Sequence, residues 1–461
     1  MNILRTKVIE QSASKGDLKR CLSAFDLILL GIGAIIGAGI FVLTGIAAAT
    51  TSGPAIIVSF AIAGLACSFA ALSYAELSAS IGGSGSAYSY AYAGLGEIVA
   101  WIIGWDLVLE YGIGACAVAI GWSGYVYDAL LSVGITIPIS FIKSYGEGGF
   151  INLPAVLIIW ALSGVLMLGV QQSARFNMLI VFIKLAAVAV FIAAAITEVE
   201  PAHWKPFMPF GWTGVVEGAA LVFFAFIGFD AVSTASEEAK NPQKDLSIGI
   251  MGSLLICTLI YIVVSGLLTG IASYTTLNTQ SPVAEAILNL GHRMAADFIA
   301  IGAIAGLTSV MLIFLYGMTR VFYSMSKDGL LPLGFSNVHP KTQTPVKVIF
   351  FSGLAMSFIA GSFSMKEVAE LVNIGTLAAF MIVCMSVIFL RYTKPNLPRP
   401  FKTPFCPLIP LLGLISCGYL MISLPWVTWI RFLGWMALGF IVYFAYGYSH
   451  SQLSKSKVNL K

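Results

Sequence analysis

Residues 31–41 read GIGAIIGAGIF, an almost wholly apolar run with four glycines. Its apolar character suits a segment that crosses the hydrocarbon of a membrane. The closely spaced glycines weaken a continuous helix and let other groups approach the backbone. In lipid, an N–H or C=O that loses its helical partner has no water to replace it. We therefore predict an interruption near residue 37 whose main-chain groups can bind a polar ligand.

The rest of the chain also fits a membrane environment. Of its 461 residues, 58% are hydrophobic and 10% are charged, with a mean hydropathy of +0.92. Ordinary soluble domains are about half apolar and about a quarter charged. We expect an all-α integral membrane protein whose partners include the lipid bilayer and no nucleic acid. There is no Gly-x-Ser-x-Gly, His-Glu-x-x-His or Cys-x-x-Cys motif, so we expect neither an enzyme nor a metal site, and no cofactor.

Twelve segments are long and apolar enough to cross a hydrocarbon core of about 30 Å. They are residues 25–48, 54–80, 97–130, 153–171, 176–197, 212–236, 246–272, 296–325, 345–361, 367–390, 407–425 and 427–448. The expected organisation is a tail at 1–24, a ten-helix core at 25–390, a loop and two further helices at 391–448, and a tail at 449–461.

The distribution of basic residues predicts the orientation. With twelve spans both tails lie on one side, and that face carries 19 of the 25 lysines and arginines, against five on the other. The remaining one, Lys184, falls within the fifth span. Because cytoplasmic loops are rich in lysine and arginine, we expect a multi-pass cell-membrane protein with both termini in the cytoplasm.

The sixth span contains a second candidate interruption, FFAFIGFD at 223–230. The first and sixth spans correspond in an inverted repeat of two five-helix units, where transporters place unwound helices. N–H groups at the start of an outer half-helix attract a carboxylate, and exposed carbonyls accept an ammonium. An α-amino acid carries both charges. The alternative, in which Gly33-x-x-x-Gly37 only packs helices closely, stays open.

Several stretches together carry a likeness to a known family. They read GIGAIIGAGIFVLTG (31–45), GGSGSAYSYAYAGLGEIVAWIIGWDLVLEY (82–111), FFAFIGFDAVSTASEEAKNP (223–242), RVFYSMSKDGLLP (320–332) and RPFKTPFCPLIP (399–410). On these motifs the chain resembles the amino acid–polyamine–organocation superfamily, and is most similar to bacterial relatives of the cationic amino acid transporters. The resemblance implies the LeuT-like arrangement, with five plus five inverted helices followed by two more.

The resemblance also implies roles for matching positions. The backbone around Gly39 would bind a substrate carboxylate, Phe224 would close over the substrate, and Phe314 would line the side-chain pocket. Relatives often have Thr or Ser where this chain has Ala38, which leaves carboxylate binding to the backbone. The expected substrate-binding residues are Ile35, Gly37, Ala38, Gly39, Ile40, Phe224, Phe226, Ile227, Phe314 and Glu110, with the carbonyls of Ile35, Phe224 and Ile227 holding the amino group.

Lys184 is the expected proton-coupling residue. Eight residues of helix place it about 12 Å into the membrane, where charged side chains are rare and usually functional. In the family that the chain resembles, a lysine here stands in for a sodium ion between the first and eighth helices. A buried lysine can exchange a proton in a useful pH range. Snorkelling to the interface is the alternative.

The other polar residues within or near the spans receive different interpretations. Glu110 lies near the membrane midplane, where it could face the substrate or pair with a neighbouring helix. Asp106 is interpreted as structural, and Asp230 is expected to orient the interrupted backbone. Tyr261 and Asn373 are interpreted as ordinary helix–helix contacts. The acids expected to be solvated near span ends are Glu76, Asp128, Glu217, Glu237 and Glu238.

These features favour proton-coupled import of small or medium neutral L-amino acids such as alanine. The alternatives are an exchanger or an importer of cationic amino acids, and, less favoured, a Na⁺-coupled carrier or a non-transporting amino acid receptor. A fixed ammonium at Lys184 argues against Na⁺ at that position. A small accessory membrane subunit is left open as a further partner.

Overall fold

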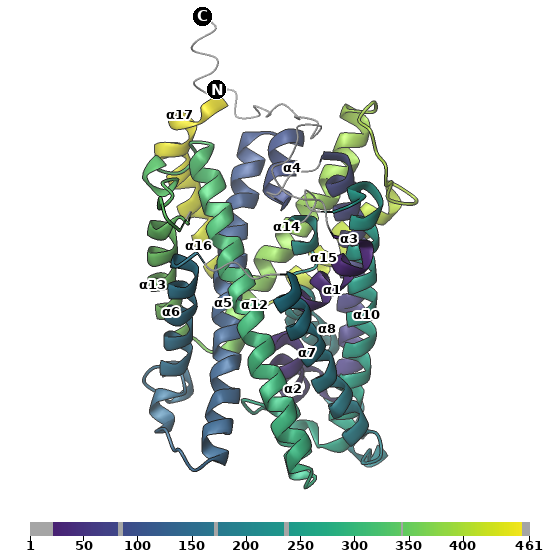
Figure 1. Cartoon of the computed structure of the whole chain (residues 1–461). Coiled ribbons are helices and arrows are strands. Elements are labelled where there is room, and N and C mark those ends of the chain that lie inside the picture. The colour runs from purple at the N-terminus through teal and green to yellow at the C-terminus, as the bar shows by residue number, and fades with distance from the viewer. Residues whose placement is uncertain (1–21, 82–85, 170–173, 235–238, 343, 454–461) are drawn as a thin grey trace, which may run out of the picture.

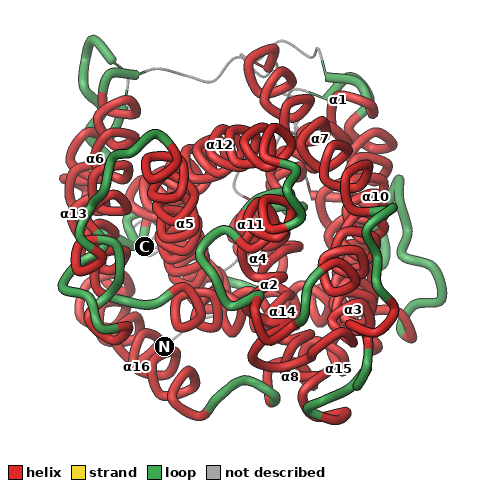
Figure 2. Tube along the Cα trace, turned by 90° about the horizontal axis from the view of Figure 1, so that it is seen from below, coloured by secondary structure: helices red, strands yellow, loops and turns green. Residues whose placement is uncertain are grey.

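A computed structural model describes residues 22–81, 86–169, 174–234, 239–342 and 344–453. In these ranges the regular structure is helical, apart from an isolated bridge between Leu22 and Ala239. The helices stand side by side in one bundle (Figures 1 and 2). Most of the predicted N-terminal tail, residues 1–21, and the end of the C-terminal tail, residues 454–461, lie outside the described residues.

Seven helical stretches of the described chain are long and apolar enough to cross a membrane. They are Gly39–Ile81, Glu97–Ser132, Met178–Ala195, Gln243–Ile271, Arg293–Lys327, Met365–Thr393 and Trp426–His450. These stretches contain the whole of α2 (Thr44–Ala47), α3 (Ile56–Ile81), α5 (Glu97–Ser132), α12 (Arg293–Lys327), α14 (Met365–Thr393), α16 (Trp426–Val442) and α17 (Tyr448–His450). They also contain most of α7 (Ala174–Ala195) and most of α10 (Pro242–Ile271).

Shorter apolar helices occupy the positions of the other predicted spans. They are α1 (Ala24–Ile35), α6 (Leu153–Met167), α8 (Gly211–Val222), α13 (Val346–Ser362) and α15 (Leu408–Ile422). Three small helices complete the described set: α4 (Ser86–Gly94), α9 (Ala231–Thr234) and α11 (Pro282–Asn289). The all-helical membrane architecture agrees with the sequence analysis. The count of twelve spans and the inverted repeat remain predictions.

Both predicted interruptions are present in the chain path. α1 starts at a capping box between Ser23 and Asp26 and ends at Ile35. Ile36 is extended, and helix resumes at Gly39 as a π-helical turn. In the sixth segment, α8 passes into a 3₁₀ turn at Phe223–Phe226 and is followed by an extended residue, Ile227. The helix thus opens at both predicted positions.

Glu76 of α3 corrects one expectation. Its side chain is 2% exposed, so the prediction of a solvated carboxylate is wrong. Arg391 of α14 donates to both carboxylate oxygens, at 3.0 and 2.6 Å, and Arg399 lies 3.4 Å away. The Thr403 backbone N–H donates a further bond at 2.7 Å. This network ties the segment after α14 to α3. Glu237 and Glu238 lie outside the described residues.

A second buried carboxylate, Glu97, anchors the end of the described chain. Tyr443 donates to Oε1 at 3.0 Å, and Tyr92 donates to Oε2 at 3.2 Å. The hydroxyl of Ser451 also donates to Oε2. Because Glu97 begins α5, these bonds join the segment after α17 to the start of that long helix.

Candidate functional site

The two interruptions touch each other through their backbones. Gly228 has a φ of +113°, and a Cβ placed there would lie 2.9 Å from the carbonyl oxygen of Ala34. On the other side, a Cβ on Gly39 would overlap Cα and Cβ of Ala225. Glycine is therefore required at both positions by close approach, and at Gly228 also by the backbone conformation.

Four consecutive N–H groups lie at the start of the outer half of the first segment. Among the described residues, the backbone N–H groups of residues 37–40 donate no hydrogen bond. The next N–H, of Phe41, bonds the Gly37 carbonyl at 3.3 Å. Buried N–H groups are rarely left unpaired, and the start of a helix carries partial positive charge. This arrangement can receive a carboxylate.

The three carbonyls expected to hold an ammonium differ in the hydrogen bonds that they already accept. Tyr261 of α10 donates to the Ile35 carbonyl at 2.9 Å, so one of its two lone pairs is used. The Phe224 carbonyl accepts a bond from the Ile227 N–H at 3.2 Å. The Ile227 carbonyl accepts none from the described residues. Free acceptor capacity therefore lies in the sixth segment, which contacts the first segment at Gly39 and Gly228.

Sequence reasoning missed the role of Tyr261. Its hydroxyl lies 2.9 Å from the Ile35 carbonyl and 2.8 Å from the Ala225 carbonyl, so it bridges both interruptions. Its side chain is fully buried. The only sequence signal was a tyrosine in the middle of a span, which is also typical of ordinary helix contacts.

Asn373 of α14 has a similar, unpredicted role. Its Nδ2 donates to the carbonyls of Ala220 and Leu221 at 2.7 and 2.9 Å. These carbonyls belong to the end of α8, where the change to the 3₁₀ turn removes their helical partners. Asn373 therefore stabilises the end of a helix inside the bundle.

Lys184 of α7 lies against the first interruption. Its Nζ donates to the Gly33 carbonyl at 2.7 Å and to the Ile36 carbonyl at 3.0 Å, and its side chain is fully buried. The stem runs beside Gly306 of α12, where a Cβ would come within 2.8 Å of the lysine Cε. The amine thus binds the carbonyls on which α1 ends, and does not snorkel to an interface.

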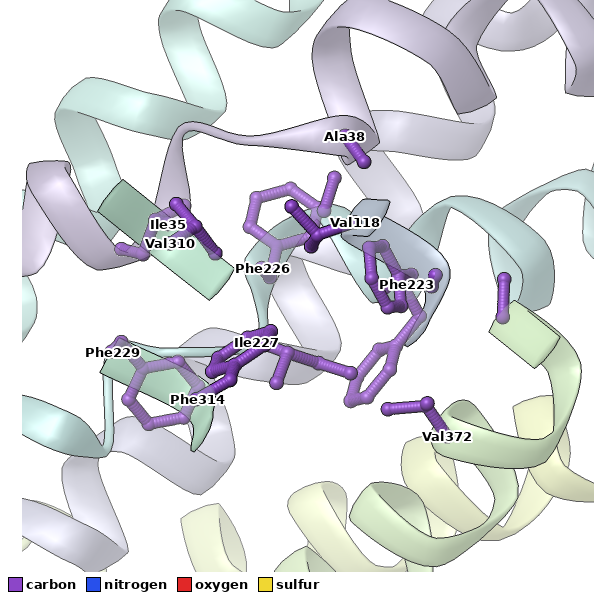
Figure 3. Close-up of a cluster of buried hydrophobic side chains, with 14 of the residues drawn as sticks. Ile35, Ala38, Val118, Phe223, Phe226, Ile227, Phe229, Val310, Phe314 and Val372 are labelled. Carbon is purple, nitrogen blue, oxygen red and sulfur yellow. The ribbon is translucent and has the colours of Figure 1, made fainter. Parts of the chain in front are cut away.

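Apolar side chains pack next to the interruptions. Figure 3 shows Val118 of α5, Val310 and Phe314 of α12, and Ile227 gathered beside the connection that joins α1 to its outer half. The Phe314 ring lies over Gly114 of α5, where a Cβ would be 2.9 Å from the ring. The side chains around the interruptions are therefore apolar on this side.

Acidic side chains on α5 lie near these apolar side chains. Asp106, Glu110 and Gly114 follow at intervals of four residues and share one helix face. Glu110 is 1% exposed, and its Oε1 has no hydrogen-bond partner among the described residues. Its neighbour Tyr111 donates to Asp230 at 2.8 Å. Asp230 therefore contacts α5 through its carboxylate, a bond that the sequence did not indicate.

The structure brings the expected substrate-binding residues and Lys184 into one buried region. Each of their side chains is at most 4% exposed, and the glycines are buried as well. No group of three or more potential metal ligands occurs in the described part of the chain. The region therefore offers main-chain donors and acceptors, one amine and apolar walls.

Comparison with known proteins shows the family to which the chain belongs. The family described as "Amino acid permease" matches residues 22–447, which is most of the chain. The chain belongs to the amino acid permease family. The permease is 48% identical to the branched-chain amino acid permease BcaP of Bacillus subtilis, over 98% of this chain and 99% of that protein. The recognition of the superfamily from sequence motifs is confirmed.

Two further relatives show the breadth of similar proteins. The permease is 48% identical to the methylthioribose transporter of Bacillus subtilis, over 98% of this chain and all of that protein. It is 37% identical to human cationic amino acid transporter 4, over 86% of this chain and 64% of that longer protein. Similar chains therefore carry names that refer to chemically different substrates.

Replacing Tyr261 with phenylalanine should weaken the site without changing its shape. The substitution removes the hydroxyl whose single proton is shared between the Ile35 and Ala225 carbonyls. Losing this donor from a buried pair of carbonyls costs about 1–3 kcal/mol. We expect a lower melting temperature of the purified protein and a smaller substrate-induced increase in that temperature. Tyr419→Phe, at an exposed tyrosine of α15, is the control and should change neither value.

Proposed function

We propose that this permease is a proton-coupled secondary transporter that imports small or medium neutral L-amino acids across the cell membrane, with both termini in the cytoplasm. The proposal includes twelve spans in a LeuT-like inverted repeat. The observation that carries it is the set of unpaired N–H groups at residues 37–40, together with free carbonyl capacity at Ile227 in the segment that contacts them. An amino acid zwitterion supplies one charge for each.

Proton coupling is supported by the position of Lys184. A protonated amine donates well to the Gly33 and Ile36 carbonyls, whereas a neutral amine is a weaker donor. Losing the proton would loosen the inner half of the first segment. Proton binding and the conformation of the site would then be linked, as coupled transport requires.

Side-chain preference is proposed from the apolar walls. Val118, Val310, Phe314 and Ile227 offer no polar partner through their side chains, which favours aliphatic substrates from alanine to the branched-chain amino acids. The name of the relative BcaP points the same way. A cationic substrate would instead need the Glu110 carboxylate, whose Oε1 is available.

A second candidate substrate is methylthioribose, because a relative of equal identity is named for it. That molecule has no carboxylate and no ammonium, so the charged ends of the proposed site would have nothing to pair with. Its apolar methylthio group would still suit the walls around Phe314. An amino acid would therefore use the main-chain N–H groups at residues 37–40 for binding, whereas methylthioribose has no carboxylate to bind there.

Uptake into proteoliposomes tests the proposal. Radiolabelled alanine, leucine, arginine and methylthioribose are offered with an inward proton gradient, with a sodium gradient, or with neither. We expect concentrative uptake of neutral amino acids only with the proton gradient. Exchange of internal for external amino acid without net uptake would establish the exchanger instead. Methylthioribose uptake without amino acid uptake would contradict the proposal.

Replacing Phe314 with alanine should change the size of the preferred substrate. The ring occupies the space over Gly114 and is 3% exposed, so its removal leaves a cavity beside the proposed side-chain pocket. We expect the ratio of kcat/KM for leucine over alanine to rise by about tenfold or more, since one or two methylene groups in an apolar pocket are worth about 1–3 kcal/mol. An unchanged ratio would place Phe314 outside the pocket.

A further inference from the structure

A second cavity lies away from the proposed transport site, at the end of the bundle that is rich in lysine and arginine. It has a volume of about 500 Å³ and lies between α6, α12, the segment after α12 and the first turn of α13. Its polar lining consists of Tyr316, Thr319, Arg320, Tyr323, His339 and Thr344. Leu166 and Ile349 contribute apolar wall. The size falls in the range of small-molecule sites.

Helix length would place the cavity near the surface of a membrane that the bundle spans. α12 has 35 residues, so it is about 52 Å long and extends beyond a hydrocarbon core of about 30 Å. Arg320 precedes the end of this helix at Lys327 by seven residues, or about 10 Å. Tyr316 is 40% exposed and Phe351 of α13 is 57% exposed. Aromatic residues of this kind are enriched where headgroups begin.

Arg320 is held in place but not neutralised. Its guanidinium lies over the Tyr316 ring, 4.8 Å from the centroid. Among the described residues it forms no ion pair with a carboxylate and donates no hydrogen bond. Stacking uses the face of the guanidinium and leaves the N–H groups at its edge available. These donors match the geometry of a phosphate group.

The surroundings add positive charge. α13 begins at Val346 beside the cavity, so its positive end lies close to Thr344 and Pro345 of the lining. Lys341 and Lys347 are exposed on the segment before α13 and in its first turn. Basic pockets between membrane helices on the cytoplasmic side are suited to anionic lipid headgroups.

We propose that this cavity binds the phosphate headgroup of an anionic glycerophospholipid from the adjacent leaflet. Arg320 contacts the phosphate oxygens, and the hydroxyl of Tyr323 supplies a further donor. Leu166 and Ile349 contact the start of the acyl chains. The apolar walls and the position at the membrane surface favour a lipid over free phosphate, which would use only the charge.

Lipid binding here does not depend on which solute is transported. The same helix, α12, carries Phe314 at the proposed pocket and Gly306 against Lys184. A lipid bound at Arg320 would stabilise α12 relative to α6 and α13. Lipid binding is measured on the purified protein without transport. The proposed transport function can thus be rejected while the lipid site is supported, and the lipid site can be rejected while the transport function is supported.

Lipid binding to the purified protein tests the proposal. Short-chain phosphatidylglycerol, short-chain phosphatidylcholine and inorganic phosphate are each titrated, and binding is measured by thermal shift and native mass spectrometry. We expect phosphatidylglycerol to bind and to raise the melting temperature, with phosphatidylcholine and phosphate much weaker. For Arg320→Gln we expect an apparent Kd for phosphatidylglycerol at least about tenfold higher, because a charge-assisted contact is lost. The matched control is Lys402→Gln, which removes an exposed charge that is not part of the cavity lining and should change Kd less than about twofold.

Several results would overturn the proposal. One is equal binding of phosphatidylglycerol by the wild type and Arg320→Gln. Another is an equal loss of binding in Lys402→Gln, which would mean unspecific attraction. A third is stabilisation by inorganic phosphate that matches the lipid. If Arg320→Gln does not fold, Arg320→Lys decides, because it keeps the charge but loses the planar fork. Its Kd should then be raised at least about threefold, and an unchanged Kd rejects the site.

Discussion

Replacing Lys184 with methionine should abolish proton-driven accumulation of amino acid. Methionine keeps a long apolar stem beside Gly306 but removes the amine that binds the Gly33 and Ile36 carbonyls. Two buried carbonyls then lack donors, at about 1–3 kcal/mol each. We expect uptake under an imposed pH gradient to fall by about 100-fold or more. The measurement is initial uptake into proteoliposomes, with internal pH held constant.

Two comparisons make this result specific. Lys184→Arg keeps a donor and a charge and should retain more uptake than Lys184→Met, although its larger head strains the contact with Gly306. Binding of substrate, measured by thermal shift, should persist in Lys184→Met if the protein folds. Uphill, pH-driven uptake by a folded Lys184→Met protein would reject Lys184 as the coupling group.

Replacing Gly39 with alanine should separate the two interruptions. The added Cβ overlaps Cα and Cβ of Ala225, so one backbone must move. Overpacking of this kind costs about 1–3 kcal/mol, and the movement shifts the N–H groups of residues 37–40 relative to the sixth segment. We expect the apparent affinity for a neutral amino acid to fall at least about tenfold. Saturation of uptake and substrate-induced thermal shift both measure it.

The chain provides a matched control for this substitution. Gly434 lies in α16, and a Cβ placed there meets nothing within 4 Å. Gly434→Ala should leave affinity and melting temperature unchanged or slightly raise the latter, because alanine favours a helix. If Gly39→Ala behaves like Gly434→Ala, the contact between the interruptions is not what forms the site.

The interruptions could be predicted because their cause is local. Glycines within an apolar run mark where a helix in lipid can open, and the chain path opens at Ile36 and Ile227 as expected. Helix geometry also predicted a position for Lys184 well inside a span, and its side chain is buried in the bundle. The two carbonyl partners of Lys184 could not be predicted, because they depend on how α7 packs against α1.

Partners across the bundle could not be predicted from single spans. Tyr261 and Asn373 look the same in sequence whether they bind another side chain or an opened backbone. Glu76 lies close to a span end, where solvation was expected, but Arg391 folds back onto it from 315 residues away. Such contacts depend on how distant helices pack against one another. The periodicity of a single sequence shows which face of a helix is apolar but not which residue lies opposite.

The bonds at Glu97 have a practical consequence for anyone who handles this protein. Because Ser451 and Tyr443 hold a carboxylate that no water reaches, the stretch up to Ser451 is part of the bundle. An affinity tag or a fluorescent fusion belongs after Leu453. A truncation before Ser451 would remove a hydrogen-bond donor from the buried Glu97 carboxylate. We expect the yield of purified protein to fall.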